Sequence, residues 1–287
     1  MAELAAGVHL DVPESVYHAD PAPQPSLSAS VGRILIEQSP LHAWTAHPRL
    51  NPGYAGGDVS EAADNGSILH KLILGRGADV VMVEADDWRT KAAREARDEA
   101  RGAGKLPVLA ETYVALANAA ARILGQIAAH PDCVGFADGK PEATLIWQEA
   151  NGIWCRARVD MLPGAPNSPL YDLKTTKLSA SPRSWDRRVW STYCFQAAFY
   201  LRGARALGYS PQEFLFIVAE QESPHAIATF ALAPSLMAYA ERRVERAIGW
   251  WAHALKHDEW PGYVPRTAYV EAPAWREVEE EMMEDAT

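Results

Sequence analysis

The sequence predicts a mixed α/β fold in which a mostly antiparallel β-sheet is flanked by helices. Residues 142–148 and 153–160 alternate apolar and polar side chains on either side of an Asn-Gly turn, as the strands of a hairpin do. Residues 107–129 are instead rich in Ala, Leu and Ile without alternation, which favours a long packed helix. Helical segments stand both before and after the strands, so we expect helices on the faces of one sheet.

The N-terminal part contains few regular elements. Residues 1–25 are rich in Pro, Asp and Ala and show little periodicity, which predicts an extended segment lying on the body of the protein. Residues 26–30 then offer several N-cap candidates ahead of the apolar residues of a short helix, which is expected to run to about residue 38 and to stop before Pro40. Residues 58–74 repeat apolar side chains at helical spacing, and this pattern places His70 beside a leucine-rich stripe.

The middle of the chain changes in composition. Residues 80–83 favour a short strand. Residues 88–105 carry six basic and three acidic side chains on an alanine-rich background, which predicts a solvated helix or a mobile loop with a basic bias. The long helix over residues 107–129 follows and is expected to end near a His-Pro pair.

The elements after the hairpin complete the sheet and cover it. They are expected in chain order at residues 170–175 (strand), 185–207 (helix), 214–219 and 226–230 (strands) and 234–257 (amphipathic helix). We expect a single domain over residues 26–264. An acidic tail over residues 265–287 should be frayed after Pro273.

The composition excludes several classes of protein. The 287 residues carry 27 basic and 37 acidic side chains, a net charge of −10, which argues against a uniformly basic nucleic-acid-coating surface but permits a local basic groove. Three widely spaced cysteines form neither a disulfide framework nor the CxxC pairs of a zinc or iron-sulfur site. No apolar run is long enough for a membrane span. We therefore expect a cytoplasmic protein with reduced thiols and no membrane partner.

Acidic and basic side chains gather on neighbouring strands. Asp172 and Lys174 are two residues apart on a strand, so their side chains project to the same side. On the preceding strand, Asp160 is the last of a row that shares one face with Arg156 and Arg158. A lone Asp-Leu-Lys triplet is weak evidence. With Asp160 upstream, it matches the D…(D/E)xK core of a metal-dependent nuclease.

The position of Glu142 depends on the length of the hairpin loop. A two-residue loop of Asn151 and Gly152 would point Glu142 away from Asp160. A three-residue loop over residues 150–152, with Gly152 left-handed, pairs Glu142 with Asp160 instead. Like charges directly opposite on a sheet cost roughly 0.2 to 1 kcal/mol, so this arrangement requires a cation. Carboxylates without paired cysteines favour Mg²⁺ or Mn²⁺.

The chain resembles the PD-(D/E)XK superfamily of nucleases, and the wider pattern is similar to its RecE-type branch, the exonuclease VIII and lambda-exonuclease-like group. The resemblance extends from about residue 7 to residue 263. The matching segments, in chain order, are VPESVYHAD, LSAS with SPLHAW, NGSILHKLIL, EATLIW, CRARVD, YDLKTT, QAAFY and DEWPGY. Val159 stands where the superfamily name has Pro, and that residue is no ligand.

The resemblance implies the roles of the charged residues. Asp160, Asp172 and the carbonyl of Leu173 would bind the metal ion, with His70 and Glu142 near it. Taken alone, His70 is more often an ordinary helix histidine. Lys174 would orient or help to deprotonate the attacking water and offset charge in the transition state, which is what phosphodiester hydrolysis needs.

The resemblance also suggests where DNA lies. Gln196 and Tyr200 are four residues apart on one helix face, and they are assigned to the DNA backbone beside the metal. A further group of basic residues either lines a DNA path or is simply solvated. It comprises Arg187, its neighbours at positions 183 and 188, and the basic cluster over residues 89–105. Ser28 and Ser30 at a helix N-terminus suit either capture of a terminal phosphate or plain N-capping.

The implied activity is Mg²⁺-dependent 5′ to 3′ degradation of one strand of linear duplex DNA, leaving 3′ overhangs for recombination. Such proteins are bacterial or prophage-encoded, work with a single-strand annealing partner of the RecT type, and form ring-shaped homo-oligomers around DNA. One rival is a Cas4-like or helicase-associated nuclease, but those often hold an iron-sulfur cluster with four cysteines and this chain has three. The other rival is a non-catalytic DNA-end-binding protein.

Overall fold

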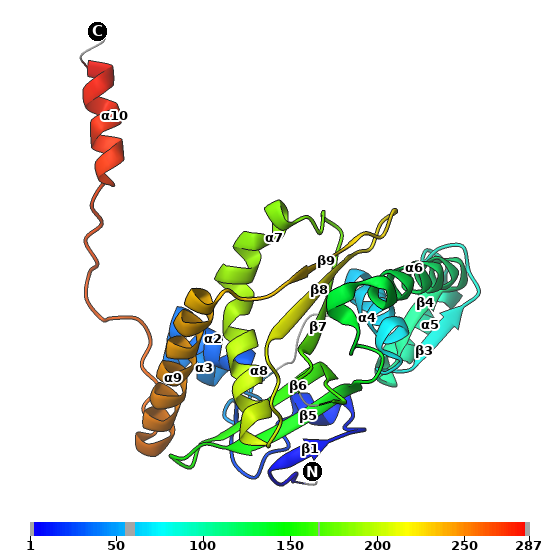
Figure 1. Ribbon diagram of the computed structural model, residues 1–287, viewed down its shortest axis with the longest axis horizontal. Helices are drawn as coiled ribbons and strands as arrows, with labels where there is room; N and C mark the ends of the chain where they lie inside the picture. Colours follow the sequence, from blue (N-terminus) through cyan, green and yellow to red (C-terminus); the bar gives the residue numbers. More distant parts are fainter. Residues whose placement is uncertain (1–2, 55–60, 166, 285–287) are drawn as a thin grey trace.

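A seven-stranded mixed sheet forms the centre of the molecule (Figure 1). The computed structural model describes residues 3–54, 61–165 and 167–284. The spatial order of the strands is β1-β5-β6-β7-β8-β9, with β2 beside β6. β7 and β8, and β2 and β6, pair in parallel and the other neighbours are antiparallel, which confirms the predicted sheet. The strands are β1 (Gly7–His9), β2 (Leu27–Ser28), β5 (Lys140–Gln148), β6 (Trp154–Leu162), β7 (Leu170–Thr176), β8 (Phe214–Glu220) and β9 (Ile227–Phe230).

Helices cover both faces of this sheet, so that two hydrophobic cores form (Figure 1). One core joins the sheet to α2, α8 and α9, and the other joins it to α4 and α6. No helix in the described part of the chain is long and apolar enough to cross a membrane. The helices are α1 (Glu14–His18), α2 (Ala29–Glu37), α3 (Pro40–Thr45), α4 (Glu61–Leu74), α5 (Lys91–Gly102), α6 (Ala110–Ala129), α7 (Pro182–Arg188), α8 (Cys194–Ala206), α9 (Pro234–His257) and α10 (Ala274–Glu284).

The β5–β6 hairpin has the register that opposes Glu142 and Asp160. Pairs 141–161 and 143–159 flank these two residues, so they face each other across the strands. The loop comprises residues 150–152, closed by a hydrogen bond from the Glu149 N–H to the Ile153 carbonyl at 2.8 Å. Gly152 has φ +85°, the left-handed conformation that favours glycine. Of the two loop lengths left open by the sequence, the protein therefore has the three-residue loop, which pairs Glu142 with Asp160.

A second, two-stranded sheet alters the start of the predicted helix over residues 107–129. β4 (Leu106–Leu109) pairs in parallel with β3 (Val80–Val83), and α6 begins only at Ala110. Alternate residues of a parallel edge strand direct their N–H groups away from the partner, so Pro107 can occupy such a strand without losing a ladder hydrogen bond. The prediction of helix at residues 107–109 was wrong for this reason.

The helix predicted over residues 185–207 is interrupted. The chain forms α7, then a π-helical turn at Val189–Tyr193, then α8. A π turn inserts an extra residue into the helical repeat, and apolar spacing at 3.6 residues per turn does not reveal it. The short helix predicted to run to about residue 38 is present as α2, capped by Ser28, and residues 27–28 form β2 against β6 just before it.

Both ends of the chain are more regular than expected. The N-terminal segment includes β1, which extends the sheet beside β5, and the short helix α1. The tail after Pro273, expected to be frayed, forms the helix α10 and projects away from the body (Figure 1). Residues 58–60 of the helix predicted over residues 58–74 lie outside the described residues, and α4 accounts for the rest.

Gly203 on α8 lies against the buried ring of Trp147 on β5. A Cβ atom at this position would lie 2.6 Å from Trp147 Cζ3. We expect Gly203→Ala to lower the free energy of unfolding by about 1 to 3 kcal/mol, because overpacking outweighs the gain in helix propensity. Gly249→Ala on α9 is the control. Its Cβ would meet nothing within 4 Å, so propensity alone should stabilise the protein. Urea denaturation of both variants measures the contrast, and equal effects would contradict it.

Candidate active site

The site lies where β6 and β7 separate. In the described part of the chain, these strands share a single backbone bridge, between Met161 and Tyr171. Beyond this bridge the side chain of Asp160 takes the place of a strand partner, and its Oδ2 accepts a hydrogen bond from the Leu173 N–H at 2.7 Å. The N–H and C=O of one strand residue point to the same edge, so the Leu173 carbonyl also faces the gap.

His70 brings α4 to the two opposed carboxylates. Its Nε2 lies 3.0 Å from Asp160 Oδ2, and its Nδ1 lies 3.4 Å from Glu142 Oε1. One ligand atom from each of these three residues lies within 4.8 Å of the others. One imidazole nitrogen and two carboxylates are donors that suit a divalent cation such as Mg²⁺ or Mn²⁺. The three cysteines are buried elsewhere and contribute no donor to this group.

Asp172 and Lys174 form a buried pair directly beside this cluster. The ammonium of Lys174 contacts Asp172 Oδ2, and the side-chain amide of Gln196 donates to Asp172 Oδ1 at 2.5 Å. Burial raises the pKa of Asp172 to about 6 although Lys174 opposes this shift. Burial disfavours the charge of Lys174, but the carboxylates of Asp172 and Asp160 outweigh it and raise the pKa of Lys174. Lys174 is therefore charged at neutral pH.

Burial and mutual charge also shift the pKa values within the cluster. Burial opposes protonation of His70, but Asp160 and Glu142 outweigh it and raise the pKa of His70 to about 9. Burial, assisted by the charge of Asp160, raises the pKa of Glu142 to about 7. Burial likewise favours the neutral form of Asp160, but His70 and Lys174 outweigh it and lower the pKa of Asp160. A divalent cation on these donors would compete with the proton of His70.

We expect the free energy of unfolding of the metal-depleted protein to fall as the pH rises from about 4.5 to about 9. The pKa of His70 is about 9 in the folded state and 6.5 ordinarily, so its contribution is complete below pH 6.5 and is lost as pH rises through 9. The raised pKa of Glu142 likewise lowers the free energy of unfolding as the pH rises from 4.5 to about 7. The contribution of His70 is on the order of 2 to 3 kcal/mol. Urea denaturation in EDTA across this range measures it.

Two controls separate this effect from a general pH dependence. His70→Gln should flatten the decline above neutral pH, because the titrating group is gone. Mn²⁺ should bind more tightly as pH rises and should release protons on binding, because the ligands must be deprotonated. A wild-type protein whose stability in EDTA rises between neutral pH and pH 9 would contradict the assignment of the raised pKa to His70.

The N-terminal segment forms one wall of the site through Arg158. The guanidinium of Arg158 donates to the Val12 carbonyl at 2.6 Å and lies 4.7 Å from the ring centroid of Tyr17. Its Nε lies 3.7 Å from Glu142 Oε2, and Glu142 itself has φ +53°, a strained conformation for this residue type. Strand alternation already placed Arg158 on the Asp160 face. Its partners were missed, because nothing in residues 1–25 indicates which strand they contact.

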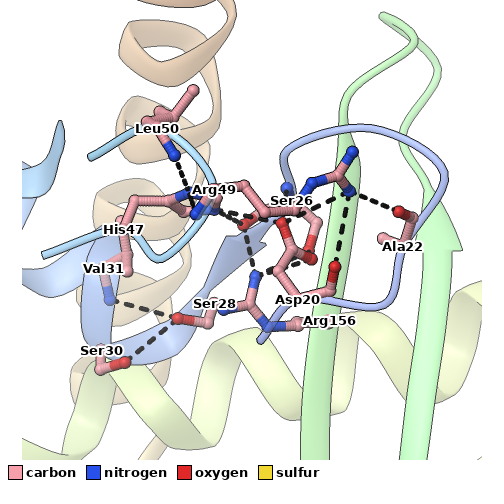
Figure 2. Close-up of polar contacts among 10 residues, drawn as sticks. All are labelled: Asp20, Ala22, Ser26, Ser28, Ser30, Val31, His47, Arg49, Leu50 and Arg156. Carbon is pink, nitrogen blue, oxygen red and sulfur yellow. Dashed lines mark hydrogen bonds and ion pairs between the residues drawn. The ribbon is translucent and has the colours of Figure 1, made fainter. Parts of the chain in front are cut away.

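Ser28 and Ser30 lie at the N-terminus of α2 (Figure 2). Ser28 is the N-cap residue, and its Oγ accepts a hydrogen bond from the Val31 N–H at 3.4 Å. The Oγ atoms of Ser28 and Ser30 lie 3.1 Å apart. N-capping by Ser28 is thus confirmed, and capture of a terminal phosphate stays a prediction.

A buried network beside Ser28 ties the N-terminal segment to β6 (Figure 2). The carboxylate of Asp20 accepts hydrogen bonds from the N–H and hydroxyl of Ser26 at 2.9 and 2.5 Å. Arg156 Nη1 lies 3.0 Å and His47 Nε2 3.2 Å from the same carboxylate. All four side chains are buried. No local sequence pattern indicates this network, because its members are far apart in the chain.

The predicted DNA contacts differ in accessibility. The amide of Gln196 is held by Asp172. Tyr200 is 9% exposed and packs edge-to-face on Phe214 with ring centroids 5.9 Å apart, so its ring belongs to the core and not to an open surface. Arg187 is exposed on α7.

The comparison with known families agrees with this geometry. Residues 69–273 match the PDDEXK-like domain of unknown function (DUF3799). The chain belongs to this PDDEXK-like family. The matched region of the PDDEXK-like chain contains His70, Glu142, Asp160, Asp172 and Lys174. The match and the fold place the chain in the PD-(D/E)XK superfamily and support a nuclease.

One solved structure shares the fold of the PDDEXK-like chain. The crystal structure of a "Putative exonuclease" from Eubacterium rectale aligns with a TM-score of 0.56 and 13% identity, covering 94% of this chain and 98% of its own. The crystal structure of SSO0001 aligns with a TM-score of 0.28 and 14% identity, covering 64% of this chain and 84% of its own. No curated protein matches the chain.

Proposed function

We propose that this chain is a Mg²⁺-dependent exodeoxyribonuclease of the RecE type that degrades linear double-stranded DNA from 5′ to 3′. The observation that carries the proposal is the meeting of His70, Glu142 and Asp160 with the buried Asp172–Lys174 pair at the gap between β6 and β7. The Eubacterium rectale protein of similar fold bears the name "Putative exonuclease", which supports the exonuclease assignment.

The residues divide between holding a cation and acting on the substrate. Asp160, Asp172 and the Leu173 carbonyl would hold the ion, with His70 and Glu142 beside them. When bound, a divalent cation supplies positive charge that stabilises the attacking and leaving oxygens of phosphodiester hydrolysis.

Lys174 would act directly on the attacking water and the substrate. Its ammonium is charged and is held in place by Asp172. It would orient the attacking water and offset the charge that develops on the phosphoryl oxygens, which is the electrostatic contribution that such reactions require.

We also propose that this activity serves DNA recombination. The 3′ overhangs would feed recombination by single-strand annealing, with a RecT-type protein as partner. A ring-shaped homo-oligomer would reconcile the net charge of −10 with DNA binding, because only its inner channel must be basic. A bacterial or prophage origin and a cytoplasmic location would fit this role.

Labelled DNA tests the proposal. Linear duplexes carrying a label at either the 5′ or the 3′ ends, and a covalently closed circle, are incubated with the protein and Mg²⁺. We expect the 5′ label to be released first and the circle to stay intact. Cleavage of the circle would identify an endonuclease, and early release of the 3′ label would reverse the polarity. Binding of DNA ends without release of either label would leave a non-catalytic end-binding protein.

A further inference from the structure

A stack of four side chains leads from Lys174 to the surface of α7. The Nζ of Lys174 lies 5.3 Å from the ring centroid of Tyr193 on the π-helical turn. The Tyr193 ring stacks on Trp185 with centroids 5.7 Å apart and an interplanar angle of 8°. The guanidinium carbon of Arg188 lies 5.4 Å from the Trp185 ring. Three contacts therefore connect a buried cation at the site to an exposed cation.

The stack orders the guanidinium of Arg188 without consuming its hydrogen bonds. Trp185 is 2% exposed, so it offers Arg188 a fixed platform. Among the described residues no carboxylate pairs with Arg188, whereas Arg202 and Arg243 each pair with glutamate. An ordered guanidinium with free N–H groups is suited to bidentate binding of a phosphate.

The surface around Arg188 has the charge and the apolar groups that nucleic acid binds. Residues 177–190 carry four basic side chains and one acidic side chain in a chain of net charge −10. Leu178 and Trp190 are 59% and 52% exposed on the same segment. Basic side chains interleaved with an exposed aromatic ring are typical of surfaces that follow a nucleic acid backbone and stack bases. This segment begins three residues after Lys174, so it borders the site.

We propose that Arg188 binds a backbone phosphate of the strand being cleaved, a few nucleotides from the bond at Lys174, and that residues 177–190 carry this strand. The inference rests on the proposed nuclease function. The three contacts of the stack, each between 5.3 and 5.7 Å, set an upper limit on the separation of the two cations that corresponds to no more than a few nucleotides, given a rise of about 3.4 Å per nucleotide along one strand.

Binding is measured by fluorescence anisotropy of a labelled linear duplex with Ca²⁺ in place of Mg²⁺, for wild type, Arg188→Ala, Arg188→Lys and Arg246→Ala. Arg246 is exposed on α9 and serves as the matched loss of one positive charge. We expect Arg188→Ala to weaken binding about tenfold and to reduce the salt slope by about 0.7 to 0.9. Arg188→Lys should recover part of the affinity, because it keeps the charge but loses the bidentate geometry.

Hydrolysis of bis(4-nitrophenyl) phosphate checks that the site is intact, since this small ester cannot reach Arg188. Its rate should be unchanged in Arg188→Ala, while the KM for DNA rises. If Arg188→Ala binds and degrades DNA as Arg246→Ala does, the inference fails and the nuclease function stands. If the wild-type protein hydrolyses neither DNA nor the ester but Arg188→Ala still loses DNA binding, the nuclease function fails and the contact stands.

Discussion

Replacing Lys174 with methionine is expected to reduce hydrolysis of linear DNA by about 10²- to 10⁴-fold, because the site loses its positioned cation beside the reacting groups. Methionine retains most of the buried stem, so packing around β7 is largely preserved. Asp172 then loses its counter-charge, and its pKa, already raised to about 6 by burial, should rise further. Nucleotide release in Mg²⁺ measures the effect.

Two controls identify the cause of that loss. Lys256→Met on the exposed surface of α9 should leave hydrolysis unchanged. Mn²⁺ binding to Lys174→Met should persist, because the cluster of His70, Glu142 and Asp160 is intact. Hydrolysis within threefold of wild type would show that Lys174 takes no part in the chemistry.

Replacing Asp20 with alanine is expected to lower the free energy of unfolding by about 3 to 5 kcal/mol. The carboxylate is fully buried between Arg156, which is 5% exposed in its side chain, and His47, which is not exposed. Its removal leaves the buried guanidinium of Arg156 without its counter-charge and the two Ser26 donors without their acceptor, while Arg156 keeps its hydrogen bonds to the carbonyl and hydroxyl of Ser26. Urea denaturation measures the loss.

Asp11→Ala is a matched control for Asp20→Ala. Both aspartates have positive φ, 65° and 61°, so alanine introduces similar backbone strain at each. Asp11 also pairs with an arginine, Arg76, but its side chain is 74% exposed. Exposed ion pairs contribute about 0 to 1 kcal/mol, so Asp11→Ala should cost far less. Equal losses in the two variants would show that strain rather than the buried network dominates.

The sequence predicted the parts of the site that strand geometry determines. Alternation placed Asp172 and Lys174 on one face, and the Asn-Gly turn restricted the hairpin to two registers, of which the structure has the one that opposes Glu142 and Asp160. These inferences succeed because a strand has a period of two residues and a hairpin has few loop types. The helical stripe of residues 58–74 likewise located His70, although its contact with Asp160 came from the resemblance to a family.

The parts that depend on contacts between distant segments were not predictable. Asp20 and Arg156 are 136 positions apart in the printed sequence, and no local pattern pairs them. The π-helical turn that carries Tyr193 breaks the helical period within an apolar segment, so periodicity predicted one helix there. Tyr200 was assigned by resemblance to the DNA backbone beside the metal. Its ring packs on Phe214 in the core, and the DNA contact stays a prediction.

We propose that the cluster at the gap between β6 and β7 is a metal-dependent nuclease centre. The most direct test is nucleotide release from linear duplex DNA by wild type and Asp160→Asn, each with Mg²⁺ and with EDTA. We predict release only by wild type with Mg²⁺, because Asp160 contacts both His70 and the Leu173 N–H. Release that persists in EDTA, or in folded Asp160→Asn with Mg²⁺, would contradict the account.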